Sequence, residues 1–205
     1  MKFVLFVEGP TEKLVLPQFL KRWLDVRLDK RVGIQPVQFE GYAQLICDTP
    51  TKARLYLAKE DVIAVIALLD LYGPNIYPED KPDKVSRYEW AKSHLEGRVG
   101  HSRFRQFFAV HELEAWLLSV PSLFPTDIAR GFPGRASNPE DVNFNEPPAK
   151  LLARLYWEKT RRSYKKIVDG KQLFDKLDPN AAYEKCPMLR EMLDEMLRLA
   201  VEAGQ

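Results

Sequence analysis

Acidic side chains directly follow three apolar segments of the chain, each of which is typical of a buried strand. Parallel strands place their carboxyl ends at one edge of a sheet, so carboxylates far apart in sequence can converge there. Crowded carboxylates repel one another unless a cation neutralises them, and oxygen ligands suit Mg²⁺ or Mn²⁺ better than Zn²⁺. Such an ion commonly screens phosphate oxygens and activates a water molecule. The residues concerned are Glu8 after segment 3–7, Asp70 after segment 61–69, and Glu112 and Glu114 after segment 104–110.

His111 and the glutamates at positions 112 and 114 follow the third apolar segment. An imidazole with an ordinary pKa near ~6.5 is a candidate general base, and a hydrogen-bonded structural histidine is the alternative. On a helix, residues two positions apart point about 200° away from each other, so only one of Glu112 and Glu114 would face the site. Glu112 is favoured because it lies nearer the strand end, while Glu114 would require the segment to stay extended. For either glutamate, a surface helix charge is the alternative.

A second candidate site is basic. Between residues 150 and 171 the chain has eight basic residues and two acidic ones, interleaved with Tyr156, Trp157 and Tyr164. Basic and aromatic side chains together can follow a nucleic-acid backbone and stack on exposed bases. A solvated helix face with its aromatic residues in the core explains the same pattern equally well. The candidates for binding phosphate or nucleic acid are Lys13, Arg161, Arg162, Lys165 and Lys166.

The elements that position these residues alternate along the first part of the chain. Gly9-Pro10 turns the chain after the first strand, and Thr11 is the predicted N-cap of the helix that follows. Strands alternating with helices predict βαβ units and a mainly parallel central sheet flanked by helices, an α/β fold. The predicted strands are 3–7, 34–39, 61–69 and 104–110, the later helices are 49–59 and 85–95, and 71–83 is a proline-rich loop.

The composition changes after about residue 119. Segment 124–148 is rich in Pro, Gly, Asn and Asp, which predicts loop or short helical turns. Segment 149–203 shows only helical periodicity, in three pieces broken at Gly170, Pro179 and Pro187, and 188–201 has a one-sided apolar stripe typical of core packing. The chain is therefore predicted to have an α/β domain over 1–120 and an all-helical extension over 121–205, together forming one compact unit.

The composition is that of a soluble globular protein, with 205 residues of which 45% are apolar and 29% charged. No apolar run approaches the ~20 residues of a membrane span, and the first one is too short for a signal peptide. Cys47 and Cys186 are too few for a disulfide framework, which predicts a reducing, cytoplasmic environment. The net charge of +2 favours no partner class. The chain contains neither a nucleophile elbow nor a phosphate-cradling P-loop.

Several motifs resemble those of a known family. Val7-Glu8-Gly9-Pro10-Thr11-Glu12 resembles the first motif of toprim domains, whose strand-end glutamate matches Glu8. The later Asp-x-Asp motif reads Asp70-Leu71-Tyr72, with tyrosine in place of the second aspartate. The chain looks most similar to a toprim-like bacterial family known only as a domain of unknown function, numbered 4276, related to overcoming-lysogenization-defect toprim nucleases. The motifs LDLYG at 69–73, HELEAWLL at 111–118, EPP at 146–148 and CP at 186–187 extend this resemblance over most of the chain.

The resemblance implies a toprim-like fold and a phosphoryl-transfer enzyme that uses Mg²⁺ or Mn²⁺, above all a nuclease of a mobile-element or phage-defence system. Glu8 and Asp70 would serve the metal and the reaction, with His111 a further catalytic candidate, and Glu112 or Glu114 would replace the missing aspartate. The alternative is a catalytically inactive module that binds a partner ATPase or nucleic acid. A homo-oligomer is compatible with both, and the family has no established activity to carry over.

Overall fold

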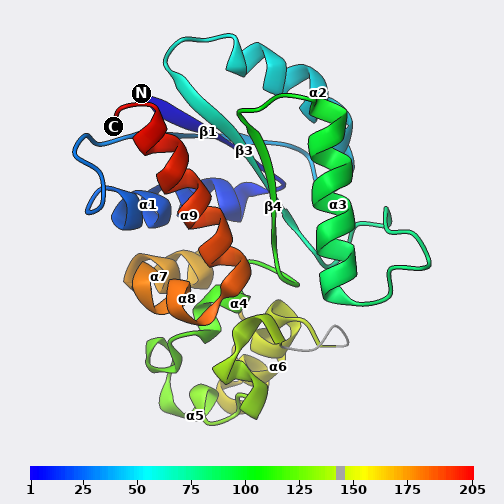
Figure 1. Cartoon of the computed structure of the whole chain (residues 1–205). Coiled ribbons are helices and arrows are strands. Elements are labelled where there is room, and N and C mark those ends of the chain that lie inside the picture. Colours follow the sequence, from blue (N-terminus) through cyan, green and yellow to red (C-terminus); the bar gives the residue numbers. More distant parts are fainter. Residues whose placement is uncertain (142–145) are drawn as a thin grey trace.

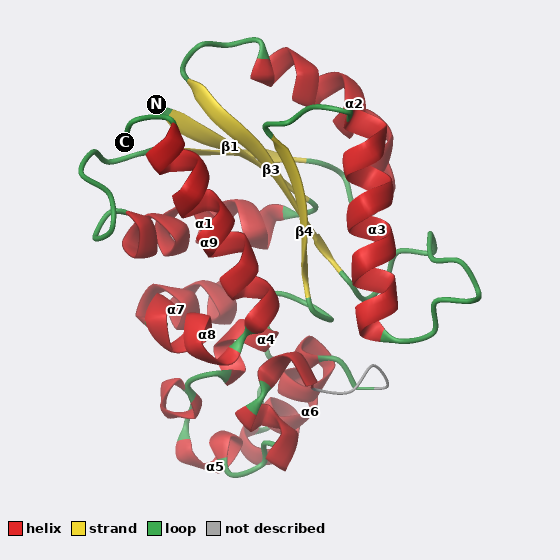
Figure 2. Cartoon of the chain, in the orientation of Figure 1, coloured by secondary structure: helices red, strands yellow, loops and turns green. Residues whose placement is uncertain are grey.

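The computed structural model describes residues 1–141 and 146–205. Its centre is a four-stranded sheet with the strand order β2-β1-β3-β4, and every neighbouring pair is parallel (Figures 1 and 2). The predicted parallel α/β architecture is therefore confirmed, with each strand within one residue of its predicted position. The strands are β1 (Lys2–Val7), β2 (Gly33–Gln38), β3 (Val62–Asp70) and β4 (Phe104–Ala109).

Both faces of the sheet are covered, which explains the unbroken apolar sequence of β1. Phe3 and Leu5 belong to the core on one face and Val4 and Phe6 to the core on the other, because successive side chains of a strand alternate. Figure 1 shows one face covered by α2 and α3 and the other by α1 and α9. The bounds of these helices are α1 (Pro10–Leu24), α2 (Tyr42–Leu57), α3 (Lys84–Val99) and α9 (Pro187–Glu202).

The order of the strands creates a crevice at the carboxyl ends of β1 and β3. From β1 the chain moves outward to β2, then crosses back over β1 to β3 and continues outward to β4. The loops after β1 and β3 consequently leave the sheet where the strand order reverses, which is where open α/β sheets bind ligands. Glu8 follows β1 directly and Asp70 is the last residue of β3. The topology thus brings the first two predicted site residues to one edge.

Two predicted helix starts in the α/β part are wrong. Gly9, and not Thr11, is the N-cap of α1, because Pro10 at the first helical position has a backbone angle suited to the helix and no N–H to satisfy. Helix α2 begins at Tyr42, seven residues before the predicted start at Thr49. Its N-cap is Gly41, whose φ of +87° suits glycine.

The extension contains short helical turns followed by four helices. The expected loop or short turns over 124–148 are present in its described part, and residues 142–145 lie outside the described residues. Gly170 is not a break, because it lies inside α7; the chain instead leaves α6 at Arg161, which adopts a left-handed φ of +54°. Helix α4 (Ala115–Leu118) precedes the extension, whose short elements are η1 (Pro121–Leu123), α5 (Thr126–Ala129), η2 (Gly134–Ser137) and η3 (Pro139–Asp141). The longer helices before α9 are α6 (Pro148–Thr160), α7 (Val168–Lys176) and α8 (Pro179–Lys185).

Helix α9 joins this extension to the sheet. Its buried residues include Leu189, Met192, Leu193 and Met196, which belong to the same core as Phe3 of β1. The predicted apolar stripe is thus confirmed as core packing. None of the described helices is both long and apolar enough to cross a membrane.

Candidate functional site

Glu8 and Asp70 are in direct contact at the carboxyl edge of the sheet. The backbone N–H of Asp70 donates to Oε1 of Glu8 over 2.8 Å. Strands β1 and β3 are paired up to Val7 and Leu68, so the residues that follow leave the sheet side by side. This hydrogen bond fixes one Glu8 oxygen beside the end of β3.

The two residues line an open depression of about 420 Å³. Glu12 adds a third carboxylate there, one helical turn after Glu8, and it is buried. Gly9 permits this arrangement, because a Cβ at that position would lie 3.0 Å from Oε2 of Glu12. The sequence analysis missed Glu12; its signal was the four-residue spacing from Glu8 across the start of a helix. The full lining is Glu8, Gly9, Pro10, Thr11, Glu12, Gly41, Asp70, Lys166 and Ile167.

Lys166 brings a positive charge into this depression from the loop between α6 and α7. Its Nζ lies 3.2 Å from Oε2 of Glu114, whose side chain is 1% exposed. Burial lowers the pKa of Lys166, but the carboxylates of Glu114, Asp70, Glu112 and Glu12 outweigh burial and raise it. Lys166 is therefore a firmly charged ammonium group among the acidic side chains.

The acidic groups themselves are poorly solvated. Burial raises the pKa of Glu8 to about 7, although the hydrogen bond from the Asp70 backbone opposes the rise. Burial likewise raises the pKa of Glu114 to about 7, against the opposing charge of Lys166. The pKa of Asp70 is raised well above its usual range by burial, and nearby carboxylates raise it further. The cluster therefore favours a bound cation or a bound proton.

Glu112 and Glu114 have different surroundings. Oε2 of Glu112 accepts a hydrogen bond of 2.8 Å from the backbone N–H of Ala149, at the start of α6. Helix α4 begins only at Ala115, so the helical spacing used to favour Glu112 does not apply to this segment. It is Glu114 whose carboxylate contacts Lys166 and contributes to the raised pKa of Asp70. The contacts therefore connect Glu114, rather than Glu112, with Lys166 and Asp70.

His111 and Lys13 are not among the residues that line the depression. His111 is 2% exposed and has a left-handed φ of +62°. Burial lowers the pKa of its imidazole to about 4, and the charge of Lys84 lowers it further. His111 is therefore neutral at pH 7. Lys13 is exposed on the first turn of α1.

Tyr72, which stands in place of the second aspartate, contacts the extension. Its hydroxyl accepts a hydrogen bond of 3.3 Å from Nζ of Lys150, and the same ammonium group lies 5.5 Å from the centre of the ring. Helix α6 is thus tied to the chain two residues after Asp70.

The predicted basic residues of the extension fall into two groups. Arg161 and Lys165 are exposed, whereas Arg162 forms an ion pair of 2.9 Å with the buried Asp169. The other oxygen of Asp169 accepts from the backbone N–H of Lys165 over 2.7 Å. Asp169 therefore holds the loop that places Lys166 at the acidic residues.

The donor set of the depression fits a hard divalent cation. Within residues 1–141 and 146–205, no three acidic, imidazole or thiol side chains lie close enough together as they stand to coordinate one ion. Glu8, Glu12 and Asp70 nevertheless offer only oxygen ligands, and the buried carboxylate of Glu114 lies next to them, paired with Lys166 at 3.2 Å. Oxygen-only sites of this kind suit Mg²⁺ or Mn²⁺. A bound ion would take over the charge compensation that Lys166 provides.

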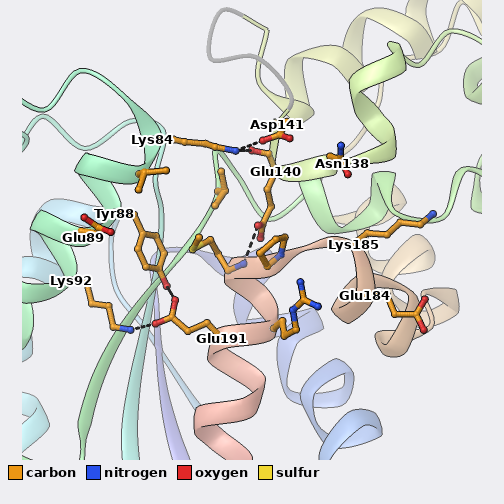
Figure 3. A pocket seen from close by; sticks show the side chains of 15 residues that line it. Lys84, Tyr88, Glu89, Lys92, Asn138, Glu140, Asp141, Glu184, Lys185 and Glu191 are labelled. Atoms are coloured by element: carbon orange, nitrogen blue, oxygen red, sulfur yellow. Dashed lines mark hydrogen bonds and ion pairs between the residues drawn. The ribbon is translucent and has the colours of Figure 1, made fainter.

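A separate cavity of about 630 Å³ lies between α3 and the start of α9, and Figure 3 shows its lining. Two ion pairs lie in its lining, Lys84 with Asp141 and Lys92 with Glu191, and the hydroxyl of Tyr88 donates to Glu191 over 3.1 Å. None of the predicted site residues lines this cavity. These pairs connect α3 to the extension.

The buried carboxyl of Glu114 predicts how stability depends on pH without metal. With a pKa of about 7 in the folded state against an ordinary 4.5, Glu114 retains a proton that the unfolded chain has already released. The free energy of unfolding in EDTA should therefore fall as the pH rises from 4.5 to 7. The contribution of this one group is on the order of 3 kcal/mol. Urea unfolding at a series of pH values measures it.

The matched comparison for this prediction is between two glutamine variants. Glu114→Gln should reduce the slope of stability against pH, whatever its overall stability. Glu60→Gln removes an exposed carboxylate before β3 and should leave the slope unchanged. Equal slopes for wild type and Glu114→Gln would show that this carboxyl is not perturbed.

Comparisons with known proteins agree with the motifs. The sequence profile of a domain of unknown function (DUF4276) matches residues 7–197. The C-terminal region of the Burkholderia pseudomallei OLD protein has a similar fold, with a TM-score of 0.50 and 16% identity over 97% of this chain and 98% of that chain. The same region of the Xanthomonas campestris pv. campestris OLD protein gives a TM-score of 0.45 and 17% identity over 99% and 98%. No functionally curated protein matches significantly. The predicted family and toprim-like fold are confirmed.

Proposed function

The chain belongs to the DUF4276 family, and we propose that it is a divalent-metal-dependent phosphodiester hydrolase, a nuclease, that acts in a mobile-element or phage-defence system. The observation that carries the proposal is the meeting of Glu8, Asp70 and Glu12 with a charged lysine in one depression at the point where the strand order reverses. The defence setting rests only on the resemblance to overcoming-lysogenization-defect nucleases.

The residues of the site divide into two roles. Glu8, Asp70 and Glu12, with Glu114 behind them, would hold Mg²⁺ or Mn²⁺. The ion would screen the phosphate oxygens and lower the pKa of a bound water molecule. Lys166, displaced from Glu114 when the ion binds, would contact the phosphate, because an ammonium group is a compact charge on a flexible stem. Asp169 positions it by holding its loop.

A catalytically inactive binding module is the second candidate, and two observations favour it. Tyr72 replaces an expected metal ligand, and Lys166 already compensates part of the acidic charge. Such a module would bind nucleic acid or a partner ATPase without turnover, and it would not need to collect metal ions.

Removal of metal separates the two candidates. Plasmid, single-stranded DNA and RNA are each incubated with the protein in Mg²⁺, in Mn²⁺ and in EDTA. We expect cleavage of at least one substrate in metal and none in EDTA, because the carboxylates alone provide no Lewis acid to screen the phosphate oxygens or activate water. Gel analysis of the products measures cleavage. Cleavage that persists in EDTA would contradict the proposal. So would a failure to cleave any of the substrates in either metal.

A further inference from the structure

The aromatic residues of the basic segment 150–171 differ in their exposure to solvent. Tyr156 is 4% exposed and belongs to the core, and the partly buried Tyr164 packs against it, with ring centres 5.4 Å apart. Trp157 is 55% exposed, whereas Trp23 and Trp116 are 2% and 1% exposed. Among the aromatic side chains that the structure describes, Trp157 is the one that is mainly exposed to solvent. Single exposed apolar residues are common, so the residues around Trp157 must decide whether its exposure marks a binding surface.

The face of α6 that carries Trp157 also carries basic residues and contacts the segment that follows Asp70. Lys150 and Arg154 lie seven and three residues before Trp157, which places these three residues on one side of the helix. Arg161 follows the last residue of α6, and its backbone N–H donates to the carbonyl of Trp157 over 3.0 Å. Lys150 is hydrogen-bonded to Tyr72, two residues after Asp70. At 1.5 Å per residue, Trp157 lies roughly 10 Å along the helix from this contact. A polynucleotide that lies along this face from the Tyr72 contact would reach Trp157 after a short distance.

The charges at the end of α6 and in the loop after it favour a polyanion. Lys159, Arg161 and Lys165 are exposed, and their side chains form no ion pair with a carboxylate of the described chain. Arg154, by contrast, is paired with Glu146 and Glu158. Unpaired cations in the same segment as an exposed indole fit a nucleic acid better than a protein, because phosphates neutralise the cations while a base covers the ring.

An exposed indole can in principle distinguish single strands from duplexes. Bases inside a duplex are stacked and paired, so an indole on a helix surface can stack only on a base that is unpaired. We propose that the exposed face of α6 binds an unpaired strand of DNA or RNA, with a base stacked on Trp157 and the backbone beside Arg161. This inference depends on the proposed function only for the role of the acidic depression, to which the bound strand would extend.

Binding in EDTA tests the inference without cleavage. A labelled single-stranded oligodeoxynucleotide, the matching oligoribonucleotide and the blunt duplex of the same sequence are titrated with wild type, Trp157→Ala, Trp157→Phe and Arg161→Gln. Trp157→Ala should weaken single-strand binding by about 10-fold or more and leave duplex binding unchanged, and Trp157→Phe should retain most of the affinity. Arg161→Gln should weaken single strands and duplex alike and reduce the salt dependence.

Intrinsic fluorescence gives a second readout. Single strands should quench the wild type, and Trp157→Phe should lose this quenching. Trp90→Phe, which removes a partly buried indole stacked on His94 at 4.8 Å, should retain it. Equal losses of single-strand and duplex affinity in Trp157→Ala would overturn the inference. A wild type that binds no single strand would also overturn it. In that case, a change of oligomeric state in Trp157→Ala would identify the face as a protein interface. Trp157-dependent binding without cleavage in any metal would instead overturn the nuclease proposal and leave this inference standing.

Discussion

Glu8→Gln should abolish cleavage while nucleic-acid binding stays close to wild type. The amide retains the oxygen that accepts the Asp70 N–H, so the end of β3 keeps its hydrogen bond. What is lost is the negative charge at the depression, which serves the metal and the reacting phosphate and not the affinity of the basic face. We expect turnover in Mn²⁺ to fall by about 100-fold or more, the lower end of what a positioned acid–base group contributes.

This prediction is checked by single-turnover cleavage alongside binding measured in EDTA. Glu60→Gln is the matched control, because it removes an exposed carboxylate that precedes β3 and is not part of the depression. It should cleave at the wild-type rate. The complementary double change Lys165→Ala with Lys166→Ala should weaken binding and flatten its salt dependence by about one unit of slope for each phosphate that the variant no longer neutralises. Retained cleavage in Glu8→Gln would place the reaction elsewhere in the molecule.

The second large effect that we expect is a rise in melting temperature when a divalent metal ion binds. A cation that binds only the folded protein stabilises it by about 2.7 kcal/mol at 100 times its dissociation constant. For a domain of this size, that corresponds to a rise in melting temperature of about 5–11 °C. Asp70→Asn should remove most of this rise. It should also slightly stabilise the metal-free protein, because burial disfavours the charged form of the Asp70 carboxyl and raises its pKa.

Thermal melts in Mg²⁺, Mn²⁺ and EDTA measure this response. Asp29→Asn changes an exposed aspartate in the loop between α1 and β2 and should respond to metal as wild type does. If the melting temperature of Asp70→Asn rises with metal as much as that of wild type, Asp70 is not a ligand. If neither protein responds, the inactive-module candidate becomes the better account.

The sequence by itself determined the sheet and its two acidic strand ends. An apolar run such as 3–7 is a local signal, because a strand covered on both faces needs an apolar residue at every position. The alternation of strands with helices then required parallel pairing, and parallel pairing placed Glu8 and Asp70 at one edge. These predictions depended on neighbouring residues and on chain direction, so they needed no knowledge of distant contacts.

Only the tertiary structure decided which other side chains join that edge. Lys166 follows Glu8 by 158 residues, and it reaches Glu114 because Arg161 ends α6 in a left-handed conformation and Asp169 holds the loop. No local pattern encodes such an approach, since it depends on how the extension packs on α1. The same packing buries Tyr156 and leaves Trp157 in solvent, although the two residues are adjacent in sequence. Adjacent helical positions differ by about 100°, so the direction of the core decides which residue of such a pair is buried.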